Sequence, residues 1–285
     1  MTVRPARIAA AVWWVVLPVA VMIHAALAVL AVAEFTTMGW PLPTWFDTVA
    51  VTLVLASAAV GMTAGGRTTL RAAADSRRLR SLIRTARRPV PRPIQNKAAL
   101  LGCADRVDAV AGDEAFAVAY GLIRPRILVS TGLATALTLA EISAVLAHER
   151  EHLQRRDPLR MLAARLVAAW GCYLPAARWL AGRAMLRREL AADRAAARCT
   201  GPNILAGALL KLASMPACES VAAASPTGDG PRSLEARVTQ LESGRPPRHR
   251  PAMSRLLASA GTLALLGAAS LCCAALSQVP SGGVL

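Results

Sequence analysis

Two histidines and a glutamate stand in the order His148-Glu149-x-x-His152. They close a segment, 139–153, whose apolar residues recur at helical spacing, so the two imidazoles should lie one turn apart on one helix face. This arrangement can hold one zinc ion and leaves Glu149 beside the open coordination position. The alternative is a pair of surface histidines on a charged helix. We disfavour it because an accidental match is rare in a chain with only 4 histidines.

A hydrolytic zinc site needs a third protein ligand as well as a position for water. Glu189 and Asp193 stand four residues apart and so share a helix face. Glu189 could bind the metal while Asp193 accepts the remaining N–H of a ligand histidine. Taken alone, the two acids also fit an ordinary surface charge pattern. Beside the first motif, the metal-site interpretation is favoured.

Several short elements are expected around these residues. The stretches 116–120 and 126–130 are apolar and β-branched, with a turn between them, and predict a small sheet beside the motif helix. Its edge could pair with an extended peptide substrate, although a purely structural role is equally compatible with the sequence. Asp157 precedes a proline and is a candidate N-cap. A flexible loop is expected at 217–232 and a short helix at 234–241.

Four motifs resemble the BlaR/MecR-type membrane metallopeptidases in order and spacing. They are A-Y-G-L-I-R-P-R-I-L-V-S at 119–130, G-L at 132–133, A-V-L-A-H-E at 144–149 and R-D-P-L at 156–159. A looser resemblance is to HtpX-type membrane proteases, which share the H-E-x-x-H and E-x-x-x-D motifs. The resemblance implies that His148, His152 and Glu189 bind Zn²⁺ and that Glu149 is the catalytic base. Together with the spacing, it makes the chain an expected zinc metalloendopeptidase, with Asp193 supporting a ligand histidine.

The composition is that of a membrane protein, since 55% of the residues are hydrophobic while the formal net charge is +16. The positive charges cluster beside apolar runs, which indicates membrane sidedness. The arginines of 77–93 are expected to follow anionic lipid headgroups. Nucleic-acid binding is the disfavoured alternative, because no aromatic residues interleave with them.

Three apolar runs, at 8–33, 48–62 and 256–276, are candidate transmembrane helices. The stretch from Arg67 to Lys97 has ten basic residues and one acid, so the positive-inside rule places it in the cytoplasm. A fourth run, 161–181, contains two arginines and cannot cross the bilayer once, because His152 and Glu189 would then lie on opposite sides. A helical hairpin or an interfacial amphipathic helix is expected there.

The predicted fold is therefore mainly α-helical and membrane-integral, with a cytosolic zinc-peptidase domain that contains a small β-sheet. The predicted regions are a transmembrane hairpin (1–66), a basic cytosolic linker (67–98), the peptidase domain (99–245, with 161–181 at the membrane) and a C-terminal transmembrane helix (246–285). The BlaR/MecR type carries an extracellular penicillin-binding sensor after its last span. Only a short tail follows residue 276 here, so we expect no such sensor and no binding of β-lactams.

The expected protein lies in the cell membrane as a multi-pass protein, with its active site on the cytoplasmic side. Its expected role is regulatory proteolysis in signal transduction, with a protein substrate that by resemblance includes a small winged-helix repressor. Quality control of membrane proteins, as in HtpX-type proteases, is the alternative within the enzyme class. A non-catalytic membrane sensor or scaffold is the alternative outside it. The intact Glu149 argues against the scaffold, because a structural zinc site has no use for it.

Overall fold

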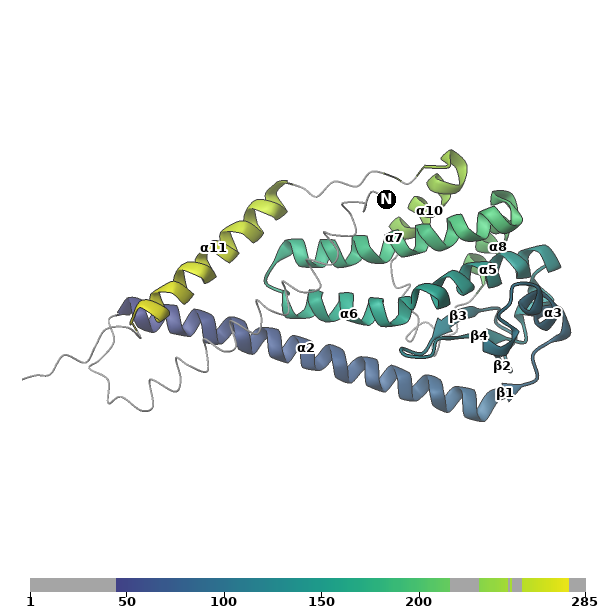
Figure 1. Cartoon of the computed structure of the whole chain (residues 1–285), viewed down its shortest axis with the longest axis horizontal. Helices are drawn as coiled ribbons and strands as arrows, with labels where there is room; N and C mark the ends of the chain where they lie inside the picture. Colours follow the sequence, from purple (N-terminus) through teal and green to yellow (C-terminus); the bar gives the residue numbers. More distant parts are fainter. Residues whose placement is uncertain (1–44, 216–230, 246, 248–252, 277–285) are drawn as a thin grey trace, which may run out of the picture. The chain divides into compact units, whose positions relative to one another are not determined.

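The structure is a computed structural model that describes residues 45–215, 231–245, 247 and 253–276 (Figure 1). It divides into two compact units, one drawn from Met1–Thr68, Leu166–Leu180 and Pro251–Leu285 and the other from Thr69–Arg165 and Ala181–Arg250. The described part is mainly helical with one small sheet, as predicted. The helices are α2 (Trp45–Ala86), α3 (Arg92–Leu100), α4 (Leu133–Ala136), α5 (Leu139–Arg155), α6 (Asp157–Trp170), α7 (Pro175–Thr200), α8 (Pro202–Ser214), α10 (Pro231–Ser243) and α11 (Met253–Leu276).

The sheet of the second unit has four strands in the order β1-β2-β4-β3. They are β1 (Arg87–Arg88), β2 (Val107–Val110), β3 (Ala117–Tyr120) and β4 (Arg126–Ser130). β3 and β4 form the predicted antiparallel hairpin, whereas β2 pairs with β4 in parallel. Gly121 opens the hairpin turn with a φ of +88°, a conformation that a side chain would strain. This topology leaves β3 at one edge of the sheet.

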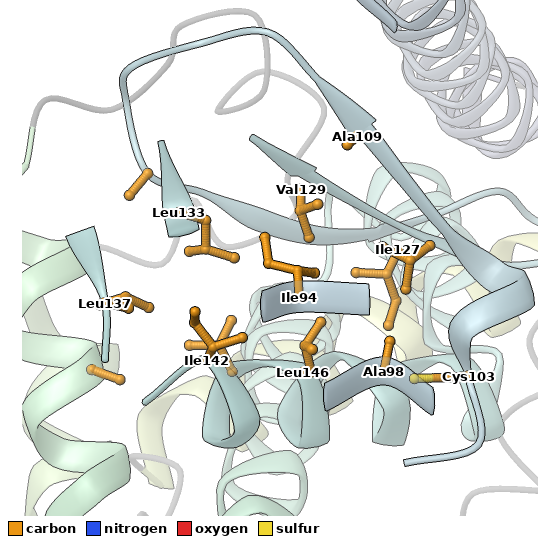
Figure 2. Close-up of a cluster of buried hydrophobic side chains, with 14 of the residues drawn as sticks. Ile94, Ala98, Cys103, Ala109, Ile127, Val129, Leu133, Leu137, Ile142 and Leu146 are labelled. Atoms are coloured by element: carbon orange, nitrogen blue, oxygen red, sulfur yellow. The ribbon is translucent and has the colours of Figure 1, made fainter. Parts of the chain in front are cut away.

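Side chains alternate between the two faces of the sheet, and helices cover both faces. On one face, Ile127 and Val129 of β4 join a core with α3 and α5, as Figure 2 shows for Ile94, Ile142 and Leu146. On the other face, buried residues of the strands pack with an apolar stripe at the end of α2, which comprises Leu79, Leu82, Ile83 and Ala86. Burying both faces makes the sheet a rigid support for α5.

Most of the stretch predicted as a basic linker, 67–98, is regular secondary structure. Residues 67–86 continue α2, β1 follows, and α3 begins at Arg92. The sequence analysis did not predict this helix, because the few apolar residues that pack on the sheet lie among many arginines.

The run 161–181 forms the helical hairpin, one of the two arrangements expected there. α6 ends at Trp170 and α7 begins at Pro175, so the chain turns within four residues. Leu174 donates its backbone N–H to the carbonyl of Gly171 in this turn. A Cβ on Gly171 would lie 3.1 Å from Cβ of Ala177, which shows how closely the turn is packed.

Close contacts join the helices of the first unit. A Cβ on Gly65 of α2 would lie 2.2 Å from Nε1 of Trp170, so only glycine leaves room for that indole. A Cβ on Gly61, one turn earlier, would lie 3.1 Å from the Trp170 carbonyl oxygen, a tight contact that is less restrictive than the one at Gly65. Two glycines four residues apart form the kind of notch that lets helices approach closely. In addition, the Ala176 N–H at the start of α7 donates to Oγ of Ser259 in α11, at 2.9 Å.

Of the candidate transmembrane runs, 48–62 lies in α2 and 256–276 in α11, while 8–33 lies outside the described residues. Within the described residues, no helix combines the length and the apolar character needed to cross a membrane. The transmembrane role of these runs stays a prediction. The loop expected at 217–232 lies almost wholly outside the described residues, and the helix expected at 234–241 is part of α10.

Candidate active site

Helix α5 positions the H-E-x-x-H motif. A capping box starts it: Thr138 accepts from the Glu141 N–H, and the Glu141 carboxylate accepts from the Thr138 N–H. The helix ends at Arg155, and its C-cap residue Arg156 adopts the left-handed conformation with a φ of 52°. Its apolar side packs on the sheet through Ile142 and Leu146, so α5 is fixed at both ends and along one face.

The two motif histidines and Glu189 converge in a buried cluster. The Nε2 atoms of His148 and His152 lie 3.1 Å apart. The Glu189 carboxylate oxygens lie 3.5 Å from Nε2 of His148 and 3.6 Å from Nε2 of His152. Ligand atoms around a tetrahedral zinc ion lie about 3.3 Å apart, given metal–ligand distances of about 2.0–2.1 Å. The three residues could therefore hold a metal ion together.

The Glu189 carboxylate also shows that the cluster suits a cation. Its Oε2 atom is buried and has no hydrogen-bond partner among the described residues. An unsatisfied buried carboxylate oxygen is costly unless a positive group faces it. Two imidazoles and a carboxylate are the ligand set of many hydrolytic zinc enzymes, so the donor chemistry fits zinc.

The outer nitrogen of each histidine faces a carboxylate. Nδ1 of His152 lies 2.9 Å from Oδ2 of Asp157, and Nδ1 of His148 lies 3.0 Å from Oδ1 of Asp193. A carboxylate in this position holds the proton on Nδ1 and leaves the Nε2 lone pair for a metal. The structure thus places Asp193 where the sequence analysis expected it. Asp157, expected as an N-cap, lies in the equivalent position at the other histidine.

Two largely buried arginines, with side chains 14% and 13% exposed, lie behind these carboxylates. Arg237 of α10 donates from Nε and Nη2 to the two oxygens of Asp193, each at 2.7 Å. Arg188 of α7 lies with Nε 3.6 Å from Oδ1 of Asp157. Sequence analysis missed both arginines and the role of Asp157. The available signals were weak, because the chain has 33 Lys and Arg residues and acids commonly begin helices.

The electrostatics of the cluster favour anionic carboxylates. Burial alone would raise the pKa of Glu189, but His148, His152 and Arg237 lower it to about 2. Burial alone would lower the pKa of His148, but Asp193 and Glu189 raise it to about 10. The buried carboxylates therefore favour a positive charge between them, which a divalent cation would supply.

Glu149 lies apart from these pairs. It is buried, and burial raises its pKa, while His148 and His152 act to lower it. The backbone of Ala119, in edge strand β3, forms a hydrogen bond with it. A carboxylate with a raised pKa is suited to accept a proton and pass it on.

The outward edge of β3 runs beside Glu149. The Ser130 N–H donates to the Phe116 carbonyl, so Phe116 and Ser130 are a hydrogen-bonded pair. Such pairs alternate along an antiparallel ladder, so the next one is Val118 with Leu128. The backbone groups of Ala117 and Ala119 consequently point away from β4. An extended peptide can pair with such an edge.

A comparison with protein families matches residues 116–241 to the family described as BlaR1 peptidase M56. No curated protein matches the chain. The matched segment contains every side chain of the site, from His148 on α5 to Arg237 on α10. It also contains the hairpin whose residues carry much of the resemblance noted above. The family match indicates a protease of the BlaR1 type, and residues 116–241 are similar to that family over less than half of the chain.

Proposed function

We propose that the protein is a zinc-dependent metalloendopeptidase that cleaves a protein substrate in regulatory proteolysis. One observation carries the proposal: His148, His152 and Glu189 converge with their ligand atoms within 4.8 Å of one another, and Glu149 is adjacent in the chain to one of them. When bound, zinc would act as a Lewis acid and make water nucleophilic near neutral pH.

Side chains of the site would bind the ion, orient its ligands and transfer the proton. His148, His152 and Glu189 hold the ion, while Asp157 and Asp193 keep the imidazoles in the metal-binding tautomer. Glu149 accepts the proton of the attacking water and passes it to the leaving amine, as its raised pKa allows. The substrate would lie extended along β3, paired with the outward backbone groups of Ala117, since the Ala119 backbone already forms a hydrogen bond with Glu149.

The substrate class rests on the family resemblance, which points to a small winged-helix repressor. Quality control of membrane proteins is the second candidate, since HtpX-type proteases share the motifs. The two candidates are separable by offering the purified protein a folded repressor and an unfolded membrane protein. A regulatory peptidase should cut the repressor at one bond, whereas a quality-control enzyme should degrade the unfolded chain at many.

Metal analysis and proteolysis by purified variants test the enzyme proposal. The wild type should carry about one zinc per chain, and His148→Ala and Glu189→Ala should lose it, since each removes a ligand. Glu149→Gln should keep the zinc and lose about 1000-fold in cleavage rate, because the base is gone. Glu151→Gln is the matched control, since Glu151 lies on the same helix and pairs with Arg155. Undiminished cleavage by Glu149→Gln would exclude the proposed mechanism.

We further propose that the protein is a multi-pass protein of the cell membrane with its active site in the cytoplasm. The apolar runs and the asymmetry of the arginines support this topology. The predicted membrane segments, 48–62, 161–181 and 256–276, also fall largely in one compact unit. Reporter fusions should place position 40 outside and positions 110 and 200 inside. Opposite sides for 110 and 200 would contradict the topology, because one ion could not bind His152 and Glu189.

A further inference from the structure

Helix α10 lies about 40 residues beyond the last candidate metal ligand, yet it supplies a side chain to the metal site. Arg237 extends from α10 to Asp193 and Glu189 of α7. Its side chain is only 13% exposed, while Asp193 is fully buried. A buried arginine is stable only where its donors are satisfied, so this placement is specific to these carboxylates.

The contact with Asp193 is bidentate. Nε and Nη2 each donate to a different carboxylate oxygen at 2.7 Å, so the two planar groups lie fork to fork. Such a pair fixes both the position and the rotation of the carboxylate. Because Oδ1 of Asp193 lies 3.0 Å from Nδ1 of His148, fixing the carboxylate also orients that imidazole.

The third nitrogen of the same guanidinium faces the other acid of the site. Nη1 lies 3.6 Å from Oε2 of Glu189, the buried oxygen without a hydrogen-bond partner among the described residues. Arg237 therefore touches the carboxylate that would bind the metal and the carboxylate that orients a histidine. It also places one positive charge beside two buried negative ones, which reduces their mutual repulsion.

We propose that Arg237 is a positioning residue for the metal centre, so that the centre is complete only when α10 is docked on α7. The proposal rests on the zinc site proposed above but does not require proteolysis. According to the proposal, the guanidinium group of Arg237 aligns Asp193, His148 and Glu189 for an ion, and the mere docking of α10 is not enough.

The chain offers controls on the same pair of helices. Gln240 of α10 donates from Nε2 to the Leu190 carbonyl of α7 at 2.8 Å, a docking contact without a metal-site partner. The exposed Arg194 of α7 donates to Oε1 of Gln240 at 3.2 Å. Gln240→Leu and Arg194→Met thus perturb the α7–α10 contact while leaving Arg237 and Asp193 in place.

The test measures metal binding by the purified full-length chain. Zinc affinity is determined by competition with a chelator, and the visible spectrum of the Co²⁺-loaded form reports the ligand geometry. Arg237→Met should lose about 10- to 100-fold in zinc affinity, the usual effect of removing a residue that supports a ligand, and should change the Co²⁺ spectrum. Arg237→Lys should stay closer to Arg237→Met than to wild type, because one ammonium cannot match both carboxylate oxygens.

Gln240→Leu and Arg194→Met should stay within about threefold of wild type and keep its Co²⁺ spectrum. Because Arg237→Met leaves a buried carboxylate unpaired and could unfold the domain, Arg237→Met/Asp193→Asn removes both charges and serves as the folded comparison. This double variant should melt as a folded protein and still bind zinc weakly with an altered Co²⁺ spectrum.

Three results would overturn the proposal. The first is wild-type affinity and spectrum in a folded Arg237→Met variant. The second is an equal loss in Gln240→Leu, which would assign the effect to docking of α10 alone. Both leave the proposed zinc peptidase intact. The third is a wild type that binds no zinc, and this result would remove the proposed function together with the inference.

Discussion

At the scale of single residues, Asp108 joins all four strands of the sheet. This buried acid of β2 accepts from Oη of Tyr120 in β3 at 2.6 Å and from Nη2 of Arg126 in β4 at 3.2 Å. It also lies 3.4 Å from Nη2 of Arg87 in β1. One carboxylate thus supports the sheet on which α5 packs, although Asp108 lies far in sequence from the candidate metal ligands.

The pH dependence of stability should reveal this carboxylate. Burial alone would raise the pKa of Asp108, but hydrogen bonds and charges of Arg126, Tyr120 and Arg87 lower it overall. A pKa lowered in the folded state means that the stabilisation is fully present above the unfolded pKa of about 3.9 and is lost as the pH falls through the folded value.

Asp108→Asn should therefore destabilise the purified chain by about 2 kcal/mol at neutral pH, the value typical of hydrogen bonds to a charged group. The loss relative to wild type should shrink in acid, where the wild-type carboxyl is also protonated. Thermal unfolding between about pH 3 and pH 7 measures both effects. The control is Asp105→Asn, because the Asp105 side chain is 78% exposed. A difference between wild type and Asp108→Asn that did not vary with pH would contradict the assignment.

The residues of the candidate site differ in how far sequence could predict them. His148, His152, Glu189 and Asp193 follow fixed helical spacings, and local geometry alone brings each pair to one face. Asp157 follows His152 by five residues across a helix break, where a capping role is the more common one. Arg237 depends on how α10 folds back onto α7, and no local pattern in the sequence encodes that contact.

Among the helices and strands, too, those with a local sequence pattern were predictable and those set by tertiary contacts were not. The hairpin of β3 and β4 was predictable because a turn with glycine and proline separates two apolar stretches. β2 was not predicted, because its four residues are all buried, carry an acid in the middle and pair in parallel with a strand that is distant in sequence. The two-residue β1 is too short to leave a pattern.

The helical hairpin of α6 and α7 was predictable only in part. Its two arginines and the interruption before Pro175 excluded a single crossing, but they left open a hairpin or an interfacial helix. The deciding features are tertiary, since they are the packed turn at Gly171 and the place that Gly65 leaves for Trp170. Glycines in a helix indicate that a neighbouring element packs closely against it, but they do not identify the side chain that makes the contact.

At the scale of the whole molecule, the candidate site combines three separate stretches of the second unit, namely 148–157, 188–193 and Arg237. The first two lie on either side of the α6–α7 hairpin, so 36 residues separate His152 from Glu189. The hairpin must turn back for these two candidate ligands to meet, and the chain does turn between the end of α6 at Trp170 and the start of α7 at Pro175.

This separation gives a bound ion a second role, as a cross-link in the chain. Joining His152 to Glu189 closes a loop and removes open conformations from the unfolded ensemble. In the chain-entropy model a covalent link across such a loop stabilises by about 4 kcal/mol, and a tightly bound ion approaches that value. Chelation should accordingly lower the melting temperature by about 10 °C, while His148→Ala should melt alike with or without chelator. If the protein is the proposed zinc peptidase, the supply of zinc would then govern its lifetime as well as its activity.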